Sequence, residues 1–415
     1  MTFNRRQLIY CITALAFLKI VYLILAKPAV GLFEDHIMAV NLMQTGELFF
    51  NWDGVNNHTY QFPVYPFLIS LIYHLVGIVP WVACMFHVVL NTVTAFLLIP
   101  VFSFFLRQFR LPVYFENKVS AISFWSVLLF SLHPGIACYA MFKIHPFSLD
   151  LLMLVLPLYF TSRYFTRRCV ANLILFCLSV SLSVLTRATL LVSAIPFFLL
   201  FLEQQGFLKT VRAGLVLTLV MTLVCGPWLF RNYRQDGITG FSSMGGMTIW
   251  KGSNPQSEGS NYLDNGNYCY TLLGPHATDT LITLSVKEQD LYYRSLYLKN
   301  VRANPMGQVR LYFVKLRNFW LFRSQFGGEY GPRMKQVIPF YQILYLILLG
   351  LSIFASIQIG KRSLLLLIIP LLLSLEQSIF YVETRHRLII EPCLIFMGCI
   401  GFVYLVHAFK KTRQA

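Results

Sequence analysis

Residues 31–46, GLFEDHIMAVNLMQTG, decide how the chain is organised, because they follow directly on the first apolar run of the sequence. That run, residues 8–26, comes after two arginines and is long enough to cross a bilayer. It lacks the small-residue cleavage site of a removed signal, so we expect a retained membrane anchor. Glu34 and Asp35 then lie where this anchor leaves the membrane.

The composition is that of a polytopic membrane protein. Of 415 residues, 57% are apolar and 12% are charged, with a mean hydropathy of +0.62, which excludes an ordinary soluble domain and a disordered chain. The formal charge is +17, but Lys and Arg fall in short clusters between apolar runs, as in cytoplasmic loops rather than nucleic-acid-binding surfaces. The 9 cysteines lie mostly in apolar runs and predict buried thiols without a disulfide framework.

The charges of the loops predict the topology. The first loop, residues 27–62, carries four acids and one lysine, which favours the outer side and a cytoplasmic N-terminus. The apolar stretch 64–79 is short for a crossing, and a crossing there would invert every later loop against the positive-inside rule. We expect it to lie along the outer surface or dip into it, which leaves about ten crossing helices and both termini in the cytoplasm. The predicted spans are residues 8–26, 82–106, 119–132, 147–160, 172–185, 190–202, 214–230, 338–355, 363–381 and 388–408.

The predicted fold class is an all-α polytopic membrane protein in three parts. Residues 1–230 form an N-terminal transmembrane module with a first outer loop at 27–81, residues 231–336 an outer-face region, and residues 337–415 the C-terminal transmembrane helices. The outer-face region is predicted to be small and mixed, with short strands and loops over 237–255 and a helix over 285–302. A further helix places Val309, Phe313 and Trp320 on one face, which predicts a position in the membrane interface.

Arginines at two predicted outer positions break the positive-inside pattern. Arg187 lies in a tight link before a span, and Arg385 and Arg387 lie in the turn before the last span. Basic residues at an outer membrane boundary indicate an anionic ligand. The alternative is that they reach lipid headgroups or pair with Glu383 and Glu391. Both interpretations stay open for Arg187, whereas the Arg385 and Arg387 pair favours the ligand.

Several short blocks along the chain carry a family resemblance. They are the acidic pair with MQTG at 43–46, FPVYPFL at 62–68, LTR at 185–187, PWLFRNY at 227–233, GGMTIWKGSNP at 245–255 and ETRHRLIIEP at 383–392. In this order they resemble the GT-C glycosyltransferases, of the dolichyl-phosphate-mannose protein mannosyltransferase and lipid A aminoarabinose transferase type, in particular bacterial members. The resemblance implies a GT-C-like enzyme of the bacterial inner membrane. Such an enzyme moves a sugar from a polyprenyl-phosphate carrier to a glycolipid, polysaccharide or protein acceptor on the outer face.

The resemblance also implies roles for single residues. In the family the acidic residue of the first outer loop is the general base, which corresponds to Asp35, with Glu34 as second choice because the pair leaves the register ambiguous. An incoming hydroxyl is a poor nucleophile and benefits from such a base, and a single in-line displacement inverts the anomeric centre. The departing phosphate needs its charge held, for which arginine is suited. The expected phosphate ligands are Arg385, Arg387 and Arg187.

Other residues near these blocks are candidates for weaker contacts. His36, His58, Tyr65 and Lys251 are expected to touch the substrate. Some relatives bind a divalent metal ion near the base, for which Glu34 and His36 are the candidate ligands, with His58 as a further one. No metal-ligand spacing of the His-Glu-x-x-His kind is present, so the sequence does not favour a metal.

Structural interpretations stay open for Asp35 and for three further polar or turn residues. Asp35 before an apolar helical pattern that ends at Gly46 also predicts a helix with a capping aspartate and a terminal glycine. Glu376, inside a predicted span, is assigned to a hydrogen bond with a neighbouring helix. His145 and Pro146 are assigned to an interfacial turn, with donor contact as the alternative.

Two other functions stay open for the whole chain. A polytopic transporter or lipid flippase would also contain buried charges and outer arginines, but the sequence has no inverted-repeat hydropathy and its acidic pair lies in a loop. A family member that binds polyprenyl phosphate without catalysis is the second alternative.

Overall fold

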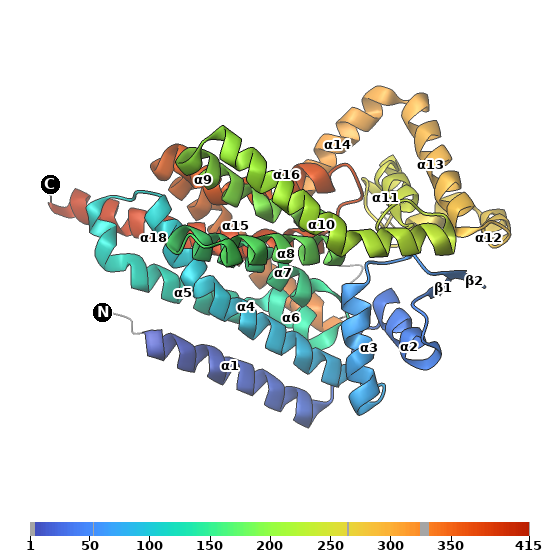
Figure 1. The fold of residues 1–415 in the computed structure, drawn as a ribbon, viewed down its shortest axis with the longest axis horizontal. Helices are drawn as coiled ribbons and strands as arrows, with labels where there is room; N and C mark the ends of the chain where they lie inside the picture. The colour runs from blue at the N-terminus through green and yellow to red at the C-terminus, as the bar shows by residue number, and fades with distance from the viewer. Residues whose placement is uncertain (1–4, 53, 264, 324–331, 415) are drawn as a thin grey trace.

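The computed structural model describes residues 5–52, 54–263, 265–323 and 332–414, and its architecture is a bundle of α-helices (Figure 1). The helices of the bundle are α1 (Arg5–Ala26), α4 (Pro80–Gln108), α5 (Val119–Leu132), α7 (Phe147–Thr166), α8 (Val170–Thr186), α9 (Ile195–Gln205), α10 (Phe207–Asp236), α15 (Pro332–Ile359), α16 (Leu364–Gln377) and α18 (Glu391–Gln414). Each predicted span overlaps one of these helices.

Shorter elements connect and cover the bundle. They are α2 (Glu34–Thr45), α3 (Val64–Val76), α6 (Pro134–Phe142), α11 (Gly245–Gly252), α12 (Pro275–Leu281), α13 (Val286–Ala303), α14 (Pro305–Trp320) and α17 (Thr384–Arg387). The strands β1 (Phe50–Trp52) and β2 (Val55–Asn57) form an antiparallel pair, in which Phe50 is opposite Asn57.

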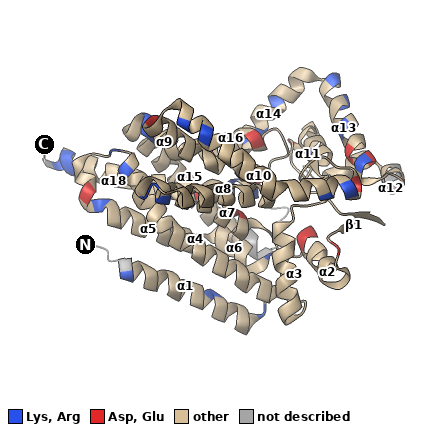
Figure 2. Ribbon diagram, viewed as in Figure 1, with Lys and Arg blue, Asp and Glu red and all other residues tan. Residues whose placement is uncertain are grey.

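The apolar helices confirm the polytopic membrane class. Within the described residues, six helical segments are long and apolar enough to cross a membrane, and seven if the bent pair Val113–Leu132 and Pro134–Phe142 counts as one span. One of the six, Gln336–Gln377, contains both α15 and α16, which are joined at Gly360 with a φ of +68°. Figure 2 shows that α4, α5 and α10 carry few charges along most of their length. The prediction of about ten crossings stays a prediction.

The ends of the bundle differ in what covers them. Figure 1 shows that α1 begins and α18 ends at one end, while α2, α3, β1, β2 and α11 lie at the other. The loop charges predict this arrangement, in which both ends of the chain lie on the same side. Helix α3 has 13 residues, or about 20 Å, too short for the bilayer core, and runs across the bundle rather than along it. This agrees with the predicted surface helix.

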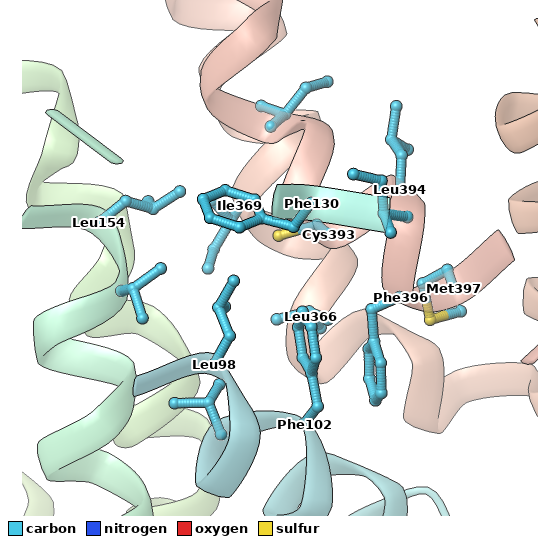
Figure 3. Packing of buried hydrophobic residues seen from close by; sticks show 14 of the residues in the cluster. Leu98, Phe102, Phe130, Leu154, Leu366, Ile369, Cys393, Leu394, Phe396 and Met397 are labelled. Atoms are coloured by element: carbon cyan, nitrogen blue, oxygen red, sulfur yellow. The ribbon is translucent and has the colours of Figure 1, made fainter. Parts of the chain in front are cut away.

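The core fills the space between α4, α5, α7, α16 and α18 (Figure 3). Leu98 and Phe102 of α4 lie beside Phe396 of α18, and the rings of Phe102 and Phe396 stack with their centroids 4.2 Å apart. Residues on all sides of α18 are buried in its first half, because this helix is surrounded by its neighbours. The bundle is therefore closely packed next to the segment that carries Arg385 and Arg387.

The outer-face region is more helical than the sequence predicted. Residues 245–252, expected within strands and loops, form α11, and the paired strands belong to the first outer loop instead. The helix predicted over 285–302 is confirmed as α13, which begins with a capping box between Ser285 and Glu288. Val309 and Phe313 of α14 are exposed, as an interfacial helix requires. The proposed boundaries after residues 230 and 336 fall inside α10 and α15.

Gly401 of α18 tests the close packing between α18 and α15. A Cβ atom at this position would overlap the backbone carbonyl oxygen of Leu351, whereas a Cβ at Gly350 of α15 would meet nothing. We expect Gly401→Ala to destabilise the protein by about 1–3 kcal/mol, because the helices must separate. Gly350→Ala is the matched control and should leave the unfolding temperature in detergent unchanged or slightly higher. Equal unfolding temperatures for the two variants would contradict this packing.

Candidate functional site

A cavity of about 480 Å³ lies where the bundle meets the outer-face elements. Its walls come from the start of α2, the start of α3, the α6–α7 and α8–α9 links, α11, and the segment from the end of α16 to α17. Six residues that the sequence predicted for the site line it: Glu34, Asp35, Tyr65, Arg187, Lys251 and Arg385. Residues from five distant parts of the chain thus share one chamber.

Helix α2 places the acidic pair at the cavity. It begins at Glu34, and its N-cap is Phe33, which has no side-chain capping bond, so Asp35 lies in the first turn and is not the cap. The helix ends at Gly46, whose φ of 77° is the left-handed conformation predicted for a terminal glycine. Before the helix, Gly31 exchanges two backbone hydrogen bonds with the α6–α7 link, Gly31 N to Phe142 O at 2.8 Å and Ile144 N to Gly31 O at 2.9 Å. These bonds fix the approach of the chain to Glu34.

Burial changes the acidity of Asp35, whose side chain is 5% exposed. Removal from water raises the pKa of Asp35 to about 8, and the negative charges of Glu34 and Asp150 act in the same direction. The positive charge of Arg187 opposes this rise in the pKa but is the smaller influence. Asp35 is therefore mostly protonated at neutral pH and becomes a carboxylate near pH 8.

Arg187 is held at the cavity by a buried carboxylate. Its Nε and Nη2 atoms donate to Oδ2 of Asp150 at 2.9 and 2.8 Å. Asp150 is fully buried, whereas the side chain of Arg187 remains 23% exposed toward the cavity that it lines. The guanidinium pairs with Asp150, and not with Glu383 or Glu391, on one edge and keeps donors on the other.

Arg385 and Lys251 bring two more cations to the cavity. Nη2 of Arg385 lies 2.9 Å from Oε2 of Glu383. Lys251 is 6% exposed, and its Nζ lies 4.5 Å from the ring centroid of Tyr270 and 5.6 Å from that of Tyr381. Burial lowers the pKa of Lys251. Within the described part of the chain no salt bridge to Lys251 is found, so aromatic faces rather than an acid hold this cation.

Arg387 does not belong to the cavity, which corrects the prediction that it binds the donor phosphate. Its side chain is completely buried and donates to the carbonyl oxygen of Leu321 at 2.9 Å and to the Tyr341 hydroxyl at 3.1 Å. The guanidinium also lies 4.0 Å from the ring centroid of Phe322. The reason is geometric, because residues two apart in a helix such as α17 point to nearly opposite sides. Arg385 faces the cavity, so Arg387 faces the bundle.

His36 and His58 also lie outside the cavity, contrary to the expected substrate contacts. Nδ1 of His36 is hydrogen-bonded to the Tyr73 hydroxyl at 2.8 Å. His58 lies between Glu47 and Asp236, at 3.6 and 3.4 Å. Helical geometry turns His36 away from the face that carries Asp35, and the position after β2 turns His58 toward the end of α10.

The residues proposed as metal ligands do not gather. Among the described residues, no group of three or more His, Cys, Asp or Glu side chains is placed to hold a metal ion. Glu34 lines the cavity, but His36 is engaged with Tyr73. The divalent metal ion near the base therefore stays a prediction.

Comparisons with known proteins do not assign a function to the chain. No protein-family model matches the sequence, and no curated protein matches it. The chain is similar to a crystal structure of ArnT from Cupriavidus metallidurans bound to undecaprenyl phosphate. The identity is 10% and the TM-score 0.44, over 96% of this chain and 78% of that chain. A likeness of this size assigns no function to the chain.

Several further residues line the cavity that the sequence analysis did not include in the predicted site. Glu376, assigned to a helix–helix hydrogen bond, lines the cavity near the end of α16. His145, assigned to a turn, also lines it, as do Thr189 and Tyr381. The signals for Glu376 and His145 were present, since both are polar residues at an apolar boundary, but nothing in the sequence distinguishes Thr189.

Substitutions of Arg385 and Arg387 test which of these two arginines stabilises the fold. Arg387→Met should lower the free energy of unfolding by about 3 kcal/mol, because it removes a buried guanidinium and leaves the hydroxyl of Tyr341 and two carbonyl oxygens without their donor. Arg385→Met, the matched variant in the same turn, removes one ion pair with the buried Glu383 and should lower the unfolding temperature less than Arg387→Met does. Thermal unfolding in detergent measures both. Unfolding temperatures that change in the reverse order would contradict the placement of Arg387 in the bundle.

Proposed function

We propose that the protein is an inverting glycosyltransferase that moves a sugar from a polyprenyl-phosphate donor to an acceptor on the outer face of the membrane. The observation that supports this is the cavity in which an acidic pair and three cations meet, at the end of an apolar bundle. The acceptor is a glycolipid, a polysaccharide or a protein. The proposed location is the bacterial inner membrane, with both termini in the cytoplasm.

The cations suit a lipid-borne phosphate. Arg187 and Arg385 are positioned by Asp150 and Glu383 and still reach the cavity, and Lys251 adds a charge that no acid among the described residues pairs with directly. A low-dielectric chamber strengthens their attraction for the charge that develops on a departing phosphate. The polyprenyl chain would remain in the membrane, because the cavity lies where the helices end.

Asp35 is proposed as the general base. The hydroxyl oxygen of the acceptor attacks the anomeric carbon of the donor sugar while its proton passes to the Asp35 carboxylate. The bond from the anomeric carbon to the phosphate oxygen breaks, and polyprenyl phosphate leaves with the electron pair. Attack opposite the leaving group inverts the anomeric centre. Burial makes Asp35 a stronger base than an exposed aspartate, since its raised pKa increases its affinity for the proton.

The position of the cavity favours an enzyme over a transporter. Transporter sites lie near the bilayer midplane between discontinuous helices. Here the walls include α2, α3 and α11, which cover one end of the bundle (Figure 1). A chamber at this boundary gives a membrane-anchored donor and a water-soluble or lipid acceptor access from the same side.

Transfer activity tests the proposed base directly. Purified protein in nanodiscs is mixed with polyprenyl-phosphate sugars and candidate acceptors, and the products are followed by mass spectrometry. Asp35→Asn should lower kcat by about 100-fold or more, because the proton acceptor is lost. Glu116→Gln, an exposed acid far from the cavity, serves as control. Full activity in a folded Asp35→Asn variant would refute the role of Asp35.

The pH profile tests the same residue independently. The carboxylate is the active form, so kcat/KM should rise with pH and level off above about pH 8, with a tenfold loss for each unit below. Glu34→Gln removes a neighbouring negative charge that raises the pKa of Asp35, so the inflection should move to lower pH. A profile that is flat from about pH 6 to pH 9, or a Glu34→Gln variant without activity, would assign the base elsewhere.

A further inference from the structure

Two buried polar atoms at the cavity have no hydrogen-bond partner within the described residues. They are Nδ1 of His145, in the α6–α7 link, and Oγ1 of Thr189, just after Arg187. Both residues line the cavity. Buried polar atoms are nearly always hydrogen-bonded in folded proteins, so two unsatisfied atoms beside one chamber indicate that something in the chamber completes them.

The ring of His145 is held in place by its neighbours. It packs edge to face on Phe33, with centroids 5.8 Å apart, and on Tyr139, with centroids 5.5 Å apart. The backbone bonds between Gly31 and the α6–α7 link fix the same segment one residue earlier. The free nitrogen is therefore part of a defined wall rather than of a mobile surface side chain.

The surroundings of His145 favour an anion. Burial, followed by the positive charges of Arg385 and Arg187, holds the pKa of His145 well below its ordinary value, so the ring is neutral. A neutral ring can place one N–H toward an acceptor without adding a third charge between the arginines. A cation would be repelled here, whereas phosphate oxygens accept hydrogen bonds and neutralise both guanidinium groups.

Thr189 brings a second donor to the wall of the cavity. It lies two residues after Arg187, whose guanidinium is anchored on Asp150. The Thr189 hydroxyl can rotate to donate to any acceptor within reach. Arg187, Thr189 and His145 together offer a charged fork and two neutral donors, which matches the several oxygens of a phosphate group.

We propose that Nδ1–H of His145 and Oγ1–H of Thr189 donate hydrogen bonds to the phosphate of the lipid donor, beside the guanidinium of Arg187. This inference rests on the proposed function and adds to it the residues that recognise the phosphate oxygens. The shared chemistry is a phosphate monoester or diester, which a polyprenyl lipid or a free phosphate ion could supply.

Matched substitutions isolate the two donors. His145→Phe keeps a ring against Phe33 and Tyr139 but removes the nitrogens, whereas His145→Asn places an amide nitrogen near the position of Nδ1. Thr189→Val keeps the shape of threonine without the hydroxyl, and Thr189→Ser keeps the hydroxyl. Thr218→Val is the control, because Oγ1 of Thr218 donates to Gly214 O on the exposed α10.

Binding of a polyprenyl phosphate without a sugar, to the full-length protein in nanodiscs, measures the effect. We expect His145→Phe and Thr189→Val each to weaken affinity about tenfold or more, and His145→Asn and Thr189→Ser to recover most of it. Wild-type affinity in both His145→Phe and Thr189→Val, with unchanged unfolding temperatures, would overturn the inference and assign water to the two atoms. If His145→Phe does not fold, the Thr189 pair decides the question by the same criterion.

Two further arms separate the possible failures. If the wild-type protein binds no polyprenyl phosphate at all, the proposed function fails together with the inference. If the wild type binds it and transfers sugar but neither substitution matters, the inference alone fails. Inorganic phosphate at millimolar concentration should not displace the lipid, and equal displacement would overturn the assignment to a lipid-borne phosphate.

Discussion

The ion pair between Arg187 and Asp150 is the interaction on which the candidate site depends. A carboxylate that is fully buried among helices is costly unless a cation and its donors compensate it, and two nitrogens of Arg187, Nε and Nη2, donate to one oxygen of Asp150. The pair joins α7 to the link after α8, so it fixes one wall of the cavity. It also leaves one edge of the guanidinium for a ligand. The negative charge of Asp150 helps raise the pKa of Asp35, and the positive charge of Arg187 opposes this rise.

The charged side chains that line the cavity are largely buried, and their arrangement suits an incoming anion. Arg187 and Arg385 each contact an acid, Asp35 favours its neutral form at neutral pH, and Lys251 rests on aromatic rings. Removal from water disfavours the charged form of each group that has no partner. The positive and negative charges in the cavity are therefore close to balance. A bound phosphate would bring negative charge to a place that already holds spare donors.

Sequence reasoning located the parts of the site but not their directions. The apolar runs fix the helices, the loop charges predicted the common end of the first and last helices, and Gly46 ended its helix as expected. Asp35, Arg187 and Arg385 meet in one cavity because they lie at neighbouring helix ends. The directions of His36 and Arg387 could not be predicted from sequence. His36 lies one residue after Asp35, which turns its side chain by about 100°, and Arg387 lies two residues after Arg385, which turns its side chain by about 200°. The helical form of residues 245–252 was missed because glycine-rich turns predict loops, whereas packing against α13 stabilises a helix there.

A structure of the protein in nanodiscs with a bound polyprenyl phosphate would test the central claim most directly. The measurement is the position of the phosphate density relative to the cavity. We predict that the phosphate lies inside it, within hydrogen-bond reach of Arg187 or Arg385 and on the same side of the chamber as Asp35. Phosphate density outside the cavity, with Arg187 and Arg385 contacting only their own acids, would contradict the account.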